Sequence, residues 1–105
     1  MPEKLVRDKI PDIIRTGGQE PTVRVAHGDE LDYLMRAKVV EEAGELLSSG
    51  SSDEIVDILE IIDALLELRS VDPSTIDDKM RRKREERGGF RRGFVLTMED
   101  GSKID

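Results

Sequence analysis

Six carboxylates surround a short Ser/Gly loop in the segment EEAGELLSSGSSDEIVD, which runs from Glu41 to Asp57. Before the loop the acids follow the pattern EExxE, and after it they follow ExxD. Carboxylate oxygens are the ligands that Mg²⁺ and Mn²⁺ prefer. Acidic residues at helical spacing more often form a solvated face. Metal chemistry is therefore indicated only if these side chains point inward.

The segment after the loop is predicted to be a helix with one apolar face. At about 100° per residue, its isoleucines and leucines occupy roughly half of the helix circumference. Glu54 falls inside this apolar arc and Asp57 borders it. Glu60 falls on the other side, as do Asp63 and Glu67. We therefore expect Glu54 and Asp57 to point toward the core and the other three acids to point toward water.

The helix before the loop also carries acids on its apolar side. Glu42 and Glu45 share the apolar arc with Lys38, and Glu41 borders it. Folding the two helices back about the middle of SSGSS predicts two facing pairs of acids: Glu45 with Glu54, and Glu42 with Asp57.

Four carboxylates that converge in a partly desolvated place require a compensating cation or protonation. A donor set of oxygens, without histidine or cysteine, favours Mg²⁺ or Mn²⁺ over zinc. The single histidine, His27, precedes the first long helix and is predicted to be a loop or capping residue. The residues themselves thus predict a site for Mg²⁺, with Mn²⁺ as the alternative ion.

Basic side chains that could hold a phosphate occur in three places: Lys38 in the first long helix, Arg7 and Lys9 in VRDKIP, and Lys83, Arg84 and Arg87 in RRKREER. Each has a plainer interpretation. Lys38 could pair with Glu42 at i+4, and RRKREER could be a solvated helix whose charges pair with one another. Both interpretations stay open at the level of the sequence.

These residues must be positioned by helices, and the sequence predicts where the helices begin and end. The expected elements are a helical turn within 1–18 that stops at Gly17-Gly18, a strand in PTVRVAH through Val23 and Val25, a helix from an Asp29 N-cap to about Ser48, a helix from a Ser51/Glu54 capping box to about Arg69, a helix from Asp72-Pro73 to Gly88-Gly89, and a strand from Phe94 to Met98 before an Asp-Gly turn. This pattern predicts a mainly α fold, a helical bundle with a small β accessory, in a single domain of residues 1–105.

Composition narrows the class of protein. The chain of 105 residues has a formal net charge of -7 at pH 7, which argues against a nucleic-acid polymer as a partner. The absence of cysteine excludes disulfides, thiolate zinc sites and a cysteine nucleophile. Neither a long apolar run nor a signal-peptide pattern is present, so we expect a soluble cytoplasmic protein that does not associate with membranes.

The apolar residues also predict self-association. Aromatic residues make up only 3% of the chain, so the core must come from aliphatic side chains concentrated between Leu31 and Leu68. The helix after the loop is apolar over about half of its circumference, more than one neighbouring helix covers. A homodimer or a higher homo-oligomer is therefore expected.

Taken together, these motifs resemble the MazG-like all-α nucleoside triphosphate pyrophosphohydrolases. EExxE followed by ExxD looks like the acidic motif of that family, and KLVRDKIP, EIVDILEIIDALLEL and KREERGGF are similar to its small single-domain branch, often described as house-cleaning. The resemblance spans most of the chain. One departure is the spacer of eight residues between Glu45 and Glu54, which is shorter than in many members.

The resemblance implies a four-helix core completed by dimerisation and Mg²⁺-dependent hydrolysis of a modified or surplus nucleoside triphosphate to the monophosphate and pyrophosphate. It assigns metal binding to Glu42, Glu45, Glu54 and Asp57. Glu41, Glu42 and Lys38 are the expected catalytic residues, and the basic residues named above are the expected phosphate ligands. Two alternatives remain open: a phosphoribosyl-ATP pyrophosphohydrolase with the same metal chemistry, and a non-catalytic helical interaction protein.

Overall fold

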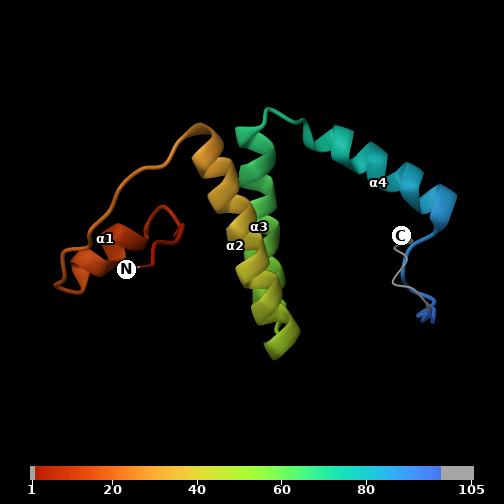
Figure 1. The fold of residues 1–105 in the computed structure, drawn as a ribbon, viewed down its shortest axis with the longest axis horizontal. Coiled ribbons are helices and arrows are strands. Elements are labelled where there is room, and N and C mark those ends of the chain that lie inside the picture. The colour runs from red at the N-terminus through yellow and green to blue at the C-terminus, as the bar shows by residue number, and fades with distance from the viewer. Residues whose placement is uncertain (1, 98–105) are drawn as a thin grey trace. The chain divides into compact units, whose positions relative to one another are not determined.

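The computed structural model describes residues 2–97, and within this range the chain forms helices and no strand (Figure 1). The helices are α1 (Ile10–Thr16), α2 (Gly28–Ser49), α3 (Ser52–Leu68) and α4 (Pro73–Arg87). The prediction of a mainly α fold is therefore confirmed. The chain divides into two compact units, residues 1–70 and 71–105, which are described separately. The single domain of residues 1–105 stays a prediction.

The first unit is built around a hairpin of α2 and α3, which lie side by side (Figure 1). Only Gly50 and Ser51 separate the two helices. Gly50 has a φ of 65°, a left-handed conformation that glycine adopts without steric cost, and its N–H donates to the carbonyl oxygen of Leu46. This tight connection fixes which residues of α2 lie beside which residues of α3.

The N-terminus of α3 confirms Ser51 as the predicted N-cap but not the full capping box with Glu54. The Oγ of Ser51 accepts a hydrogen bond from the N–H of Asp53 at 3.2 Å. In a capping box the carboxylate of Glu54 would accept from the N–H of Ser51. That N–H donates instead to Oγ of Ser49 at 3.1 Å, so the side chain of Glu54 is free to face α2.

The far end of the hairpin is closed by charge pairs. Arg69, directly after α3, donates to both carboxylate oxygens of Asp32 in α2, at 2.7 and 2.9 Å.

The prediction that Asp29 caps α2 was wrong, because the helix begins at Gly28 with His27 in the N-cap position. Asp29 lies in the first turn, where a carboxylate favours the positive end of the helix dipole. His27 occupies a capping position, although its side chain makes no capping hydrogen bond.

The predicted β accessory was wrong for the described part of the chain. PTVRVAH is irregular, and so are residues 94–97. A strand needs a partner for its backbone hydrogen bonds, and residues 2–97 offer none. Arg24 anchors the irregular segment instead, through ion pairs with Glu3 at 2.9 Å and Glu30 at 2.8 Å. Met98 and the predicted Asp-Gly turn lie outside the described residues.

The predicted boundaries of the two outer helices are confirmed. In the first unit, α1 has Pro11 in its first turn and ends before Gly17. In the second unit, α4 begins after Asp72, whose side chain accepts from the N–H of Ser74 at 2.9 Å. It ends before Gly88, whose φ of 81° stops the helix.

Burial in this chain is unusual for a folded protein. Among the described residues no apolar side chain is buried, whereas Glu42 is only 6% exposed. Apolar residues of α3 stay accessible, with Leu59 59% exposed. The hairpin therefore covers its acidic centre better than its aliphatic surface. In the part of the chain that the structure describes, no helix has the length and apolar character to cross a membrane.

Candidate metal centre

The acids of α2 and α3 form two overlapping groups. Glu42, Glu54 and Asp57 each place a carboxylate oxygen within 4.8 Å of the others, and Glu41, Glu42 and Glu45 do the same. Glu42 belongs to both groups. The four acids predicted to converge are thus brought together around Glu42, with Glu41 beside them. The outward acids Glu60, Asp63 and Glu67 are exposed, as the helical wheel predicts.

Glu42 is the centre of the cluster and is incompletely satisfied. Its Oε2 atom is buried and accepts no hydrogen bond from any described donor. Its Oε1 atom lies 3.6 Å from Nζ of Lys38. A buried carboxylate oxygen without a partner is destabilising, because it has lost its hydrogen bonds to water and has formed none within the protein. A cation bound among these acids would give the carboxylate of Glu42 a partner.

Glu54 responds to this crowding through its pKa. Partial burial is the largest cause, followed by the neighbouring carboxyls of Glu42 and Glu45, and together they raise the pKa of Glu54 from 4.5 to about 7. Near neutral pH this carboxyl is thus divided between its two protonation states. When protonated, it can donate a hydrogen bond to Glu42. In the absence of metal, protonation of Glu54 therefore reduces the repulsion among these carboxylates.

This raised pKa predicts a pH dependence of the metal-free protein. A carboxyl whose folded pKa exceeds its unfolded pKa contributes stability that is fully present below 4.5 and is lost as the pH rises through about 7. The free energy of unfolding should therefore increase between about pH 8 and pH 5. The lowered pKa values of Asp32, about 2, and of Glu41 oppose this trend only at lower pH.

Urea unfolding with a chelator present, followed at several pH values, measures this increase. In the Glu54→Gln variant the group that takes up the proton is absent, so its stability should vary much less over the same range. A wild-type profile that is flat or that falls on acidification would contradict the assignment.

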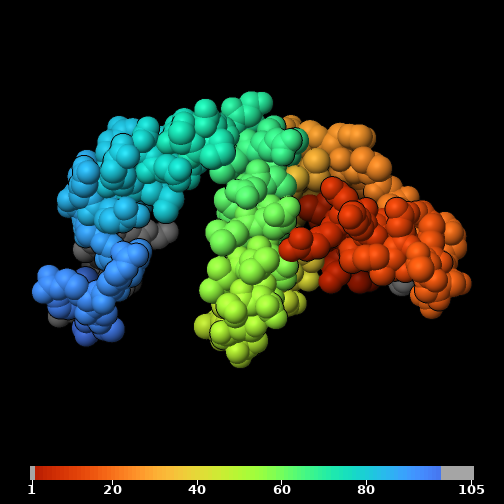
Figure 2. All heavy atoms as spheres, turned by 180° about the vertical axis from the view of Figure 1, so that it is seen from behind, coloured from red at the N-terminus to blue at the C-terminus, as the bar shows by residue number. Residues whose placement is uncertain are grey.

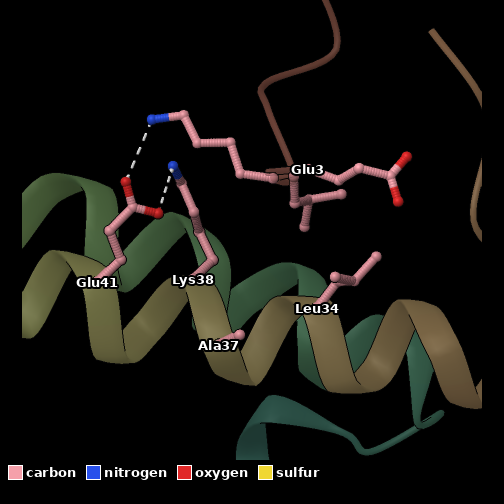
Figure 3. A pocket seen from close by; sticks show the side chains of 7 residues that line it. Glu3, Leu34, Ala37, Lys38 and Glu41 are labelled. Atoms are coloured by element: carbon pink, nitrogen blue, oxygen red, sulfur yellow. Dashed lines mark hydrogen bonds and ion pairs between the residues drawn. The ribbon is translucent and has the colours of Figure 1, made fainter. Parts of the chain in front are cut away.

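Three cations surround the cluster. Arg7 donates to Oδ1 of Asp57 at 2.6 Å, and Lys4 pairs with Glu41 at 3.2 Å. Lys38 pairs with the other oxygen of Glu41 at 3.2 Å, and Figure 3 shows this contact as a dashed line. Lys38, and then Lys4, lower the pKa of Glu41. The i,i+4 pair of Lys38 with Glu42 that the sequence suggests is present, although the contact with Glu41 is shorter.

Lys4 was missed by the sequence analysis, although Arg7 was included. Nothing periodic connects residue 4 to residue 41, because the N-terminal segment is not helical there. The only signal was its membership of KLVRDKIP, the same short motif that contains Arg7.

A small cavity of about 130 Å³ opens beside Lys38 and Glu41 (Figure 3). Its remaining wall contains apolar side chains, Leu34 and Ala37 from α2 and Leu5 from the N-terminal segment, and the polar residues Glu3 and Lys4. The cavity thus adjoins the acidic cluster and offers both an apolar surface and ammonium groups.

The other predicted phosphate ligands are divided between the two units of the chain. Lys9 is exposed and occupies the N-cap position of α1. Lys83, Arg84 and Arg87 are exposed on α4, in the second unit. Arg84 and Arg87 lie in its last turn, where cations favour the negative end of the helix dipole. Their role in phosphate binding stays a prediction.

Comparison with known proteins assigns no family. No protein-family model matches the chain, and no solved structure matches it. An uncharacterized protein of Mycolicibacterium smegmatis is 40% identical over 50 residues, which are 48% of this chain and 51% of that relative. The match spans only about half of each protein, and its name describes no activity.

Proposed function

We propose that the α2–α3 hairpin holds Mg²⁺, or Mn²⁺, through Glu42, Glu45, Glu54 and Asp57. We further propose that the protein hydrolyses nucleoside triphosphates to the monophosphate and pyrophosphate, as the MazG-like enzymes that it resembles do. The observation that carries the proposal is the buried, unpartnered Oε2 atom of Glu42, which lies among acids from two helices. On an acidic face that was merely solvated, the central carboxylate would be exposed to water, whereas Glu42 is only 6% exposed.

The cluster fits a divalent cation in chemistry and in charge. Its donors are all carboxylate oxygens, the ligands of Mg²⁺ and Mn²⁺. Five acids face three basic side chains, so the fully ionised cluster has two negative charges in excess. A divalent ion would balance this excess and supply a partner for Glu42.

In the proposed reaction a water oxygen bonds to the α-phosphorus, and the bond from that phosphorus to the bridging oxygen of the β-phosphate breaks, so that pyrophosphate leaves. The proton of that water passes through a carboxylate of the cluster to solvent. A bound metal would supply positive charge for the phosphates and would lower the pKa of the attacking water. Glu42, Glu45, Glu54 and Asp57 hold that charge in place. Lys38 can reach a phosphate oxygen from α2. Glu41 is a weak base because of its lowered pKa, so its fitting role is to orient Lys38.

We also propose that a second copy of the chain covers the accessible apolar side of α3. Ile55 and Leu59 lie on this side and are 46% and 59% exposed. A chain of this size that buries no described apolar side chain by itself has little hydrophobic stabilisation as a monomer. The same observation supports the second candidate, a non-catalytic interaction protein, because a different partner could cover that surface.

Metal and nucleotide titrations test the proposed function. We expect Mg²⁺ or Mn²⁺ to stabilise the protein by about 2.7 kcal/mol at a hundred times its dissociation constant, a shift that differential scanning calorimetry detects. With Mg²⁺ present, a panel of unmodified, oxidised, deaminated and methylated nucleoside triphosphates, together with phosphoribosyl-ATP, should include a substrate that releases pyrophosphate. Phosphoribosyl-ATP as the sole substrate would favour that alternative.

A Glu42→Gln variant is the matched control, since it removes the central charge and nearly preserves the shape of the side chain. It should show neither stabilisation by metal nor pyrophosphate release. A wild-type protein that binds no divalent ion in stoichiometric amount would exclude the proposed function and favour an interaction protein.

A further inference from the structure

The N-terminal segment, residues 2–9, contacts the acidic cluster through two of its basic side chains. Lys4 pairs with Glu41 at 3.2 Å, and Arg7 donates to Oδ1 of Asp57 at 2.6 Å. These partners are 37 and 50 positions away in the sequence. In Figure 2 this segment, drawn in red, lies against α3, drawn in green. An irregular segment thus places one cation on each of the two groups of acids.

Arg7 pairs with a carboxylate that the proposed metal site needs. Asp57 belongs to the group around Glu42, and its Oδ1 atom accepts the short, charge-assisted hydrogen bond from Arg7. A guanidinium and a divalent cation that share one carboxylate repel one another, and each weakens the attraction of that carboxylate for the other. The contact between Arg7 and Asp57 and the binding of metal are therefore in competition.

Arg7 can exchange partners without disrupting the fold. Its side chain is 55% exposed. A second anchor, the pairing of Arg24 with Glu3 at 2.9 Å, also holds the segment. The planar fork of arginine matches a phosphate as well as a carboxylate. Once displaced from Asp57, the guanidinium would remain near the cluster, where a triphosphate bound through metal would present its oxygens.

We propose that Arg7 is a displaceable counter-cation: it holds Asp57 in the metal-free protein and passes to the substrate phosphates when metal takes Asp57. This inference rests on the proposed function. It makes Arg7 a specificity-determining residue, because free metal must displace it without compensation, whereas a metal–triphosphate complex offers it a new partner. The site would thus favour metal that arrives with substrate.

Calorimetric titration of Arg7→Gln with Mn²⁺ alone, in the absence of nucleotide, tests the competition. Removal of the competing cation should tighten Mn²⁺ binding by about three- to tenfold. Titration with inorganic tripolyphosphate in the presence of Mg²⁺ should show the reverse, a loss of about tenfold or more, because the phosphate has lost a ligand. Arg7→Lys keeps the charge but not the fork, and it should fall between wild type and Arg7→Gln in both titrations.

Arg24→Gln is the matched control. It removes the same charge and also an anchor of the N-terminal segment, but its partners Glu3 and Glu30 lie outside the acidic cluster. Its Mn²⁺ affinity should stay within about twofold of the wild type. If Mn²⁺ binding tightens equally in Arg7→Gln and Arg24→Gln, the change in affinity comes from net charge alone, and the inference is overturned.

The inference and the proposed function can fail separately. If the wild type binds Mn²⁺ and Arg7→Gln binds it equally well or more weakly, Arg7 does not compete, and the metal site stands without it. If the wild type binds no Mn²⁺, both are wrong. Tighter Mn²⁺ binding combined with unchanged tripolyphosphate binding would also overturn the inference, because Arg7 would then have no second partner.

Discussion

Replacing Glu54 with glutamine is expected to lower Mg²⁺-dependent pyrophosphate release by about a thousandfold or more. Glu54 contributes a carboxylate oxygen to the group with Glu42 and Asp57, and partial burial with the neighbouring carboxyls raises its pKa to about 7. An amide keeps the size of the side chain but cannot supply the negative charge that holds a divalent ion. Steady-state assays of pyrophosphate release, with Mn²⁺ calorimetry beside them, measure the loss.

Glu60→Gln is the control for this substitution. Glu60 is on the same helix and its replacement changes the net charge equally, but the side chain is exposed and belongs to neither group of acids. Activity in this variant should stay within about twofold of the wild type. Full Mg²⁺-dependent activity in Glu54→Gln would exclude the assignment of this site, whatever Glu60→Gln does.

The Glu54→Gln variant should also be more stable than the wild type when no metal is present and the pH is above about 7. Under these conditions the wild type must hold Glu54 ionised beside Glu42 and Glu45, and the raised pKa records the unfavourable interaction. A variant that loses activity and gains stability separates a functional role from a structural one. A structural acid would give the opposite change in stability.

The acidic cluster could be predicted from the sequence because its geometry is local. The helical period places Glu54 and Asp57 on one side of α3, and the short connection at Gly50 and Ser51 leaves little freedom in how α2 folds back. Both predicted facing pairs lie close together: Glu42 shares a group with Asp57, and the carboxyl of Glu45 helps to raise the pKa of Glu54. The structure groups Glu42 with both acids of α3 and with Glu41 and Glu45 of its own helix.

The features that could not be predicted from the sequence depend on contacts that follow no helical or strand periodicity. Alternation through Val23 and Val25 resembles a strand, but an isolated segment gains no ladder of hydrogen bonds, and ion pairs of Arg24 hold it instead. The contacts of Lys4 and Arg7 with the cluster join irregular backbone to distant helices. No repeat in the sequence marks such a pair. The pairing of Lys4 and Arg7 with the cluster was therefore the least predictable part of the site.

A charged residue on the apolar surface of α3 is expected to have an equally large effect on self-association. Leu59→Lys should raise the dissociation constant of the proposed homo-oligomer by about a hundredfold or more, because an interface would have to bury an unpaired ammonium. Leu59 lies between Ile55 and Ile62 on α3 and is 59% exposed in the single chain. Sedimentation velocity over a range of protein concentrations should show an oligomer for the wild type and a monomer for the variant.

Stability should follow assembly in the same way. Since the described part of one chain buries no apolar side chain, the urea midpoint of the wild type should rise with protein concentration, and that of Leu59→Lys should not. Leu96→Lys is the matched control, because it replaces a leucine that is 67% exposed and lies outside the hairpin. It should sediment as the wild type does. If Leu59→Lys also sediments as the wild type does, α3 is not the interface.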